Sequence, residues 1–194
     1  MRIKNFFILL LITCIVSSAA IAQDMGQDEM MKVWQEYMTP GPVQKHMAKF
    51  VGDWVTSNKM WAAPGAEPIV SEGTAKGEML LGGRYLKTTH YGDMMGMPFE
   101  GFSLEAYDNT MKQYYSIWVD NFGTGMMMMK GTWDDATKKL TYTGTMVDPM
   151  QKKEVAVKEV FIPKDEDTYM MELYVTGPDG KEYKNMEATY KRKK

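Results

Sequence analysis

The sequence predicts an all-β protein, an antiparallel closed β-barrel of about ten strands preceded by short N-terminal helices. From Asp53 onward, strand-length segments alternate with clusters of Gly, Pro, Asn and Asp. Residues 107–110, 133–137 and 177–180 have the composition of hairpin turns, and no helical segment separates the strands. Closure into a barrel is the simplest way for such a sheet to avoid exposed edges, and a two-sheet sandwich is the alternative.

The expected strands cover residues 53–62, 69–80, 84–92, 99–107, 112–120, 125–133, 139–147, 154–163, 168–176 and 181–192. Several strand faces mix aromatic and polar residues: Tyr114, Ser116, Trp118 and Asp120 alternate with a second, more apolar set on the same strand. A mixed face suits a barrel interior that holds a ligand or water. The alternative is that these polar groups point to solvent.

Residues 27–38 have apolar positions at helical spacing, and Pro42 begins a second short helix that reaches Phe50. Both helices are expected to be amphipathic covers for the barrel, with partner binding as the alternative. The expected organisation is therefore a signal peptide over 1–22, a helical segment over 23–50 and a barrel domain over 51–194.

The first residues have the three parts of a secretory signal. Arg2 and Lys4 form a positive start, residues 6–16 form an apolar stretch too short to span a bilayer, and Ala20-Ile21-Ala22 forms a small-x-small cleavage site. A lipoprotein signal with its lipid on Cys14 is the alternative. We therefore expect a periplasmic or secreted protein, soluble once the signal is removed.

Cleavage after Ala22 removes the only cysteine and leaves 172 of the 194 residues. The remaining 21 basic and 25 acidic residues give a net charge of −4, which argues against a nucleic-acid partner. Nothing in the composition defines an oligomeric state.

The sequence lacks the residues of most familiar catalytic sites. With no mature cysteine and only His46 and His90, it has no Cys/His metal site, no Cys nucleophile and no Gly-x-Ser-x-Gly elbow. No glycine pair has the spacing of a phosphate loop. We expect neither a metal nor a cofactor.

Methionine is abundant, with 21 residues, and clusters at 94–97 and 126–129. Thioethers are soft ligands that suit Cu(I), but methionine also serves as flexible apolar filler. Neighbouring residues of a strand point to opposite faces, so the run 126–129 cannot converge on one ion. The loop at 94–97 is the best location for the metal alternative.

Two features resemble the calycin superfamily of lipocalins and fatty-acid-binding proteins. Gly52-Asp53-Trp54 places a Gly-x-Trp at the start of the first strand, and Arg192 ends the last strand. In calycins such a basic residue packs over the tryptophan in a cation–π contact.

The chain also resembles the bacterial domain-of-unknown-function 1579 family over residues 52–192. The residues that carry this resemblance are Gly82-Gly83-Arg84-Tyr85-Leu86, Gly96-Met97-Pro98-Phe99-Glu100-Gly101, Tyr107-Asp108-Asn109, Trp118-Val119-Asp120-Asn121, Gly123-Thr124-Gly125, Gly131-Thr132, Asp148-Pro149 and Tyr190-Lys191-Arg192. The resemblance implies a lipocalin-like barrel and no established activity. The methionine run 126–129 departs from the family pattern.

Arg84, Glu100, Tyr107, Trp118 and Asp120 lie on three successive expected strands and are the candidate ligand-binding residues. We expect them to meet at or inside the barrel, where Arg84 and Glu100 would anchor the polar head of a small apolar or amphipathic ligand. A structural ion pair is the other interpretation of Arg84 and Glu100. Two further functions compete with ligand binding: a cofactor-free acid–base enzyme, and a cell-envelope interaction protein that uses the N-terminal helices.

The signal predicts a mature chain that begins at Gln23. Intact-mass measurement of the exported protein should give a mass that corresponds to residues 23–194, or that mass less ammonia if Gln23 cyclises. A lipid-modified chain beginning at Cys14 would show that the lipoprotein alternative is correct.

Overall fold

The computed structural model describes residues 26–194. The signal peptide over 1–22, its cleavage site after Ala22 and the alternative lipid site at Cys14 lie outside the described residues. Within the described part of the chain, no helix is both long enough and apolar enough to span a bilayer.

The described chain divides into two units, one that holds residues 26–39 and one that holds residues 40–194. In the first unit, helix α2 (Gln27–Met38) follows the expected helical spacing, with Asp28 and Glu29 in its first turn. Negative side chains there interact favourably with the positive end of the helix dipole. Its apolar side chains are all exposed by 45% or more: Met30, Met31, Val33, Trp34, Tyr37 and Met38.

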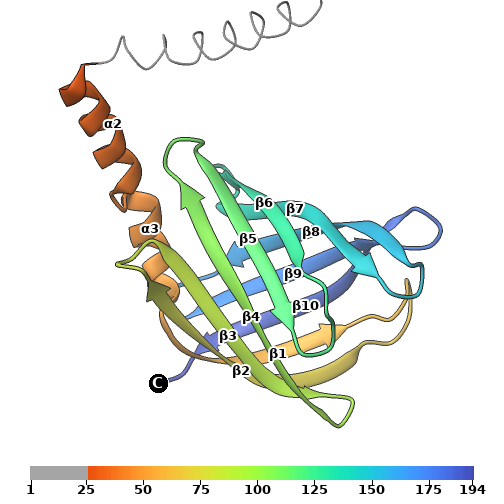
Figure 1. Ribbon diagram of the computed structural model, residues 1–194. Helices are drawn as coiled ribbons and strands as arrows, with labels where there is room; N and C mark the ends of the chain where they lie inside the picture. The colour runs from red at the N-terminus through yellow and green to blue at the C-terminus, as the bar shows by residue number, and fades with distance from the viewer. Residues whose placement is uncertain (1–25) are drawn as a thin grey trace, which may run out of the picture. The chain divides into compact units, whose positions relative to one another are not determined.

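The second unit holds helix α3 (Pro42–Met47), the short 3-10 helix η1 (Ala48–Phe50) and ten strands. The strands are β1 (Gly52–Met60), β2 (Ile69–Leu80), β3 (Tyr85–Met94), β4 (Met97–Asp108), β5 (Gln113–Asp120), β6 (Met127–Asp134), β7 (Lys139–Asp148), β8 (Lys153–Pro163), β9 (Thr168–Thr176) and β10 (Glu182–Arg192). Figure 1 shows them arranged around a barrel. The ten expected strands are confirmed within a few residues at each end.

Each strand pairs with the next along the chain, and β1 pairs with β10 to close the barrel. All pairs are antiparallel, so tight turns suffice as connections. Between β3 and β4 the turn residues Met95 and Gly96 have φ angles of 55° and 80°. Two consecutive positive φ values define the hairpin turn whose twist matches the flanking strands. The methionine loop at 94–97 is therefore a hairpin turn.

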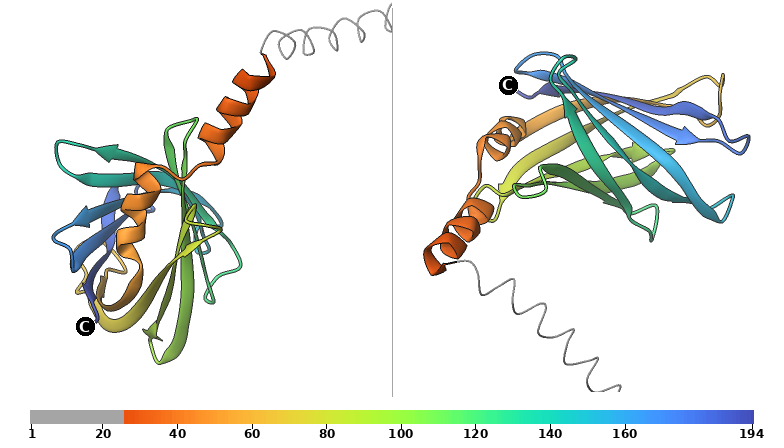
Figure 2. Two further views of the ribbon diagram at one scale, coloured as in Figure 1. Left: turned by 90° about the vertical axis from the view of Figure 1, so that its left-hand side faces the viewer. Right: turned by 90° about the horizontal axis from the view of Figure 1, so that it is seen from above.

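The two ends of the barrel differ. At one end, η1 and α3 lie across the opening (Figure 2, left), and we call this the closed end. There the Gln44 side chain donates hydrogen bonds to the Tyr107 carbonyl at 3.0 Å and to Asn109 Oδ1 at 3.1 Å. Met47 is 4% exposed. These contacts explain why residues from Pro40 onward belong to the same compact unit as the barrel.

Aromatic rings fill the closed end. Trp54 is 1% exposed and packs against Tyr169, with ring centroids 4.8 Å apart. Phe50 of η1 contacts Phe161 at 4.9 Å and Tyr169 at 5.4 Å, and Tyr169 stacks on Tyr190 at 4.2 Å. Edge-to-face and stacked pairs of this kind are each worth about 0.5–1.5 kcal/mol beyond the area they bury.

Arg192 stabilises the pairing of β1 with β10, which closes the barrel. Its guanidinium carbon lies 4.2 Å from the Trp54 ring centroid, as the calycin resemblance implied. It donates hydrogen bonds to the carbonyls of Val51 (2.8 Å) and Lys49 (2.7 Å) and to Asp167 Oδ1 (3.1 Å). Gly52 has a φ of 122°, and a Cβ there would lie 2.9 Å from the guanidinium, so this position requires glycine.

Replacing Arg192 with Met should lower the free energy of unfolding by about 2–4 kcal/mol, because the cation–π contact and the hydrogen bonds to two backbone carbonyls are lost together. Denaturant unfolding of the mature chain measures the change. Lys191→Met is the matched control, because Lys191 is the exposed neighbour on β10. Equal destabilisation by the two substitutions would show that Arg192 does not hold the closure.

Candidate functional site

The inner face of the barrel is the candidate site. The strand registers place alternate residues of each strand in the lumen, beginning with Trp54 on β1 and ending with Tyr190 on β10. The inward set carries many polar groups: Thr56, Asn58, Thr88, His90, Ser103, Glu105, Tyr107, Tyr114, Ser116, Asp120, Tyr142, Glu159, Tyr169, Tyr183 and Tyr190. A solid core would be apolar at these positions.

Two glutamates lie in the middle of the lumen. Glu105 projects inward from β4 and Glu159 projects inward from β8. Burial raises the pKa of Glu105 to about 7, although a hydrogen bond with Ser103 opposes the shift. Burial raises the pKa of Glu159 to about 8, and the charge of Glu105 adds to that shift. Near neutral pH the pair therefore holds protons that exposed carboxyls would have lost.

Phenols surround these carboxyls. Burial raises the pKa of Tyr190, and the charges of Glu159 and Glu105 add to this shift. Burial is also the main cause of the raised pKa of Tyr142 and of Tyr169, and the same two carboxyls contribute there. Tyr142 is 1% exposed, and its hydroxyl is a buried polar group without a hydrogen-bond partner. A buried hydroxyl in that state costs stability, so it marks a place where the interior is not optimised for folding.

His90 is the histidine of the inner face. Its ring lies 5.1 Å from the Trp118 ring and 5.8 Å from the Tyr190 ring, measured between centroids. Burial lowers the pKa of His90 to about 4, so the imidazole is neutral at pH 7. Among the described residues, the basic side chains at inward positions are at the two ends of the barrel: Arg192 at the closed end and Lys153 at the opposite rim.

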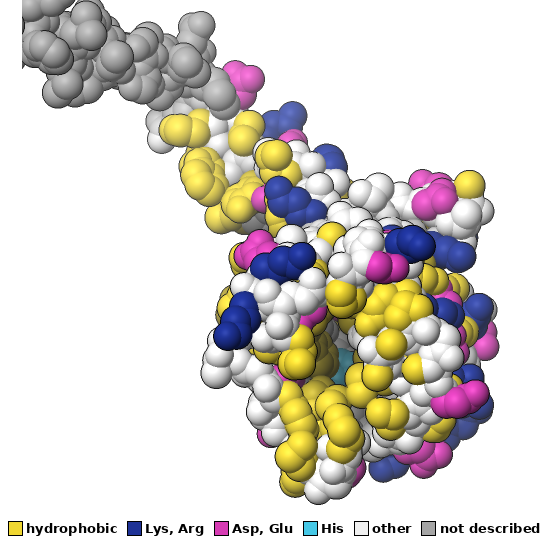
Figure 3. Space-filling view, turned by 90° about the vertical axis from the view of Figure 1, so that its right-hand side faces the viewer, with side chains coloured by type: hydrophobic (Ala, Val, Ile, Leu, Met, Phe, Trp, Pro, Cys, Tyr) yellow, Lys and Arg dark blue, Asp and Glu magenta, His cyan; other side chains and the backbone are white. Residues whose placement is uncertain are grey.

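The lumen is hollow toward the end opposite α3, which we call the open end. Figure 3 faces this end and shows a depression in the surface with a histidine side chain inside it. Inward residues such as Glu105, Trp118, Glu159, Met171 and Leu173 keep intermediate exposure, although they face the inside of a closed barrel. Water therefore reaches them from within the lumen. The carboxyls are at once enclosed by protein and in contact with this space.

The structure does not bring the five sequence-predicted site residues together. Arg84 lies in the turn between β2 and β3, is exposed, and donates to the Leu81 carbonyl at 2.9 Å. Glu100 pairs with Tyr91 in the β3–β4 ladder and points outward. The expected Arg84–Glu100 anchor for a ligand head is therefore not formed, because one residue is in a turn and the other is on the outer face.

The other three predicted residues face inward: Trp118 and Asp120 lie together toward the open end, and Tyr107 lies near the closed end. Trp118 lies over Gly101, where a Cβ would be 2.7 Å from the indole, and its N–H donates to Asp120 Oδ2 at 2.7 Å. Asp120 also accepts from the backbone amides of Phe122 and Gly123, so it stabilises the β5–β6 turn. Tyr107 contacts the Tyr114 ring at 4.7 Å near the closed end.

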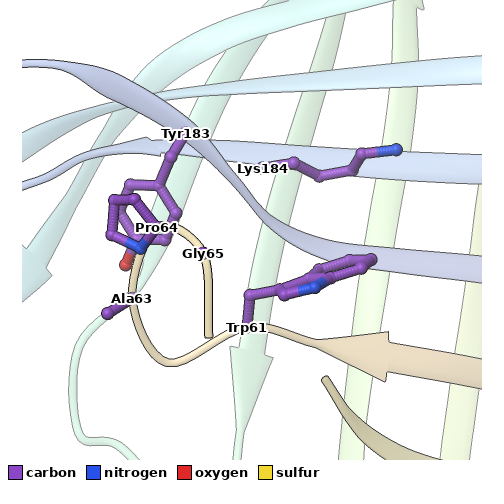
Figure 4. Close-up of a pocket in the computed structure, with 6 residues that line it drawn as sticks. All are labelled: Trp61, Ala63, Pro64, Gly65, Tyr183 and Lys184. Carbon is purple, nitrogen blue, oxygen red and sulfur yellow. The ribbon is translucent and has the colours of Figure 1, made fainter. Parts of the chain in front are cut away.

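Two further pockets lie near the two ends of the barrel. The first, of about 260 Å³, is lined by Trp61, Ala63, Pro64, Gly65, Tyr183 and Lys184 (Figure 4). Lys184 there forms ion pairs with Glu172 and Glu187, both at 2.8 Å, so its charge is already neutralised. The second, of about 290 Å³, lies near the closed end beside Tyr107, Tyr114 and Trp133. Neither pocket combines an apolar enclosure with convergent polar groups.

Within residues 26–194, no group of three or more His, Cys, Asp and Glu side chains is placed to hold a metal ion. The methionine run diverges as the alternation within a strand predicted: Met127 and Met129 face the lumen, whereas Met126 and Met128 are 52% and 64% exposed.

The fold and its interior define a closed ten-stranded antiparallel barrel with a polar, partly open lumen, of the calycin type. The family model described as "Protein of unknown function (DUF1579)" matches residues 39–192, and the chain belongs to this family.

Among solved structures, the chain is similar to Rv2717c from M. tuberculosis, with a TM-score of 0.61 and 14% identity over 80% of this chain and all of that one. A redesigned β-barrel matches with a TM-score of 0.40 and 11% identity, over 76% of this chain and 95% of that one. A search of the curated proteins gave no significant match. At these identities the likeness to Rv2717c shows the fold alone.

The two glutamates should make stability fall as pH rises. Their folded pKa values of about 7 and 8 lie above the ordinary value of 4.5, so the folded state binds more protons than the unfolded state between pH 4.5 and 8. The free energy of unfolding therefore decreases across this window. The lowered pKa of His90 acts in the opposite direction between pH 4 and 6.5.

Replacing both Glu105 and Glu159 with Gln isolates their contribution. The double variant should melt roughly 5 °C or more above wild type at pH 9 and within a few degrees of it at pH 5. The outward pair on the same strands, Glu100→Gln with Glu154→Gln, is the control and should follow wild type at both pH values. If the inner and outer variants behave alike, the inner carboxyls are not desolvated.

Proposed function

We propose that this protein is an exported binding protein that holds a small, largely apolar or amphipathic molecule in the lumen of its barrel. The ligand would enter through the open end and lie on the aromatic residues of the closed end. The proposal includes export, for which the support is the sequence of the first 22 residues.

The observation that carries the proposal is the unfilled lumen. Eight strands give a barrel just wide enough for side chains to fill or to hold one small ligand, and ten strands give a wider one. Here the closed end is packed around Trp54 and Tyr169, whereas inward residues farther along the lumen keep accessible surface. An apolar cavity with a few convergent polar groups is the usual form of a small-molecule site.

The glutamate pair supports acid–base catalysis as a second candidate. A carboxyl with a pKa near 7 is suited to exchange protons at neutral pH, and Glu105 and Glu159 both have that property. Binding without turnover of the ligand distinguishes the binding protein from the enzyme.

The exposed apolar side chains of α2, including Trp34 and Met31, support the third candidate, a cell-envelope interaction protein. Deleting residues 23–39 from the mature chain would remove a partner in that case and leave lumen binding unchanged.

Ligand entry can be measured with N-phenyl-1-naphthylamine, an uncharged dye whose fluorescence rises in apolar surroundings. We expect saturable binding and energy transfer from Trp118, which Trp118→Phe should reduce by more than half. Trp34→Phe is the control, because Trp34 lies on α2 and is not part of the lumen wall.

Filling the lumen provides the complementary measurement. Ser103 faces inward between Thr88 and Trp118, so Ser103→Phe should weaken dye binding at least tenfold. Ser57→Phe introduces the same ring on the outer face of β1 and is the control. If a folded Ser103→Phe variant binds the dye as tightly as the control does, the dye does not occupy the lumen and the proposal is wrong.

A further inference from the structure

We propose that the preferred ligand of the lumen is a small organic cation, an amine or quaternary ammonium with an apolar body, whose charge lies between Glu105 and Glu159. This inference rests on the proposed binding function and specifies the chemical class of the ligand. It is carried by the distribution of charge in the lumen, by the unpartnered hydroxyl of Tyr142 and by the surrounding aromatic rings.

The titratable groups that face the middle of the lumen are carboxyls, phenols and one imidazole. Glu105 comes from β4 and Glu159 from β8, and Asp120 lies on β5. The remaining acidic, phenolic and imidazole groups on the inner face are His90 of β3, Tyr107 of β4, Tyr114 of β5, Tyr142 of β7, Asp148 at the open end of β7, Tyr169 of β9, and Tyr183 and Tyr190 of β10.

The basic groups of the inner face cannot balance a ligand anion in the middle of the lumen. Arg192 is held at the closed end by Trp54 and by the carbonyls of Val51 and Lys49. Lys153 is an exposed residue at the open rim, opposite Asp148. An anionic head would therefore meet two carboxyls and no cation, whereas a cationic head would meet groups of opposite charge.

The rings around the glutamates are suited to hold a cation. Ammonium groups are attracted to the faces of tyrosine and tryptophan rings, and this attraction is stronger where water is excluded. His90, Trp118 and Tyr190 form one contiguous aromatic group on the lumen wall. Thioethers of Met171 and Met186, which pack against the aromatic cluster at the closed end, offer a polarisable surface to the apolar body.

Tyr142 gives the independent indication of a ligand. Its ring lies over Gly131, where a Cβ would be 2.5 Å from the ring, and its hydroxyl is buried without a partner. In the β7–β8 ladder Tyr142 is directly paired with Glu159. The hydroxyl has almost no accessible surface in the free protein, so an ammonium N–H of a ligand would satisfy its oxygen after a small displacement of the neighbouring side chains.

Binding of a cation should release protons from the pair. Near pH 7 both carboxyls are at least half protonated in the free protein, because burial and their mutual repulsion disfavour the charged forms. A positive charge between them favours ionisation, so the affinity for a permanent cation should rise with pH from 6 to 9.

The experiment compares four probes with one eight-carbon chain: octyltrimethylammonium, octylammonium, octanol and octanoate, all below their micelle concentrations. Titration calorimetry on the mature chain at pH 8 should show the two cations binding at least tenfold more tightly than octanol, and octanoate at least tenfold more weakly. For octyltrimethylammonium, the enthalpy should depend on the ionisation enthalpy of the buffer in the sense of proton release.

Variants then locate the preference. Glu105→Gln with Glu159→Gln should bring the two cations within threefold of octanol while octanol binding persists. Glu100→Gln with Glu154→Gln removes two carboxyls from the outer face of the same strands and should leave the preference unchanged. Tyr142→Phe removes the unpartnered hydroxyl and should weaken octylammonium, which has N–H donors, more than octyltrimethylammonium, which has none.

The outcomes separate this inference from the proposed function. Binding of octanol without a preference for cations, or tighter binding of octanoate, overturns the organic cation and leaves the lumen-binding function standing. A cation preference that survives in the inner double variant also overturns it, because the charge would then be recognised elsewhere. If none of the four probes binds, the proposed function itself is wrong.

Discussion

The pairing of β1 with β10 is the constraint on which the rest of the structure depends. Once these strands pair, every strand in the sheet has a neighbour on both sides, and each side chain is fixed as inward or outward. Arg192 secures this pairing by crossing from the last strand to Trp54 and to the backbone that precedes the first strand. The glycine at position 52 is a direct consequence, because any Cβ there would meet the guanidinium. The aromatic cluster at the closed end then packs on a fixed frame.

A barrel of ten strands also creates a space that its side chains do not fill. The two ends of the barrel differ in how this space is occupied. The helices η1 and α3 cover one end (Figure 2), and the other end is hollow (Figure 3). The hollow part contains Glu105, Glu159 and His90, whose charged forms are disfavoured by burial. Replacing desolvated carboxyls with apolar residues of similar size often stabilises a protein. Carboxyls that disfavour folding at alkaline pH are thus more consistent with a site than with a core.

Local sequence patterns predicted the strands and their turns. Which side chains face the lumen depends on the pairing register of strands that are far apart in the sequence. Residues that favour turns, such as Gly96 in the turn between β3 and β4, separate the strands. The strand bounds could therefore be assigned from neighbouring residues alone. The divergence of Met127 and Met128 followed for the same reason, since it needs only the alternation within one strand. To predict that Glu100 faces outward, one must know which face of β4 is turned toward the inside of the closed barrel. Counting hairpin registers outward from an inward Trp54 would have placed Glu105 in the lumen and Glu100 outside it. Arg84 was assigned to a strand although it lies in the turn before β3, where no register constrains it.

The physical difference between the two carboxyl pairs shows why facing governs function here. Glu100 and Glu154 are on the outer face of β4 and β8, where water solvates their charge and a bound ion would gain little. Glu105 and Glu159 are on the inner face of the same strands, where each is enclosed by protein and acts on the other. The same residue type on the same strands is therefore exposed to water on the outer face and desolvated on the inner face. Because a single-residue shift in register would exchange the two faces, the closure that Arg192 secures at one end of the barrel also determines which carboxyls face its middle.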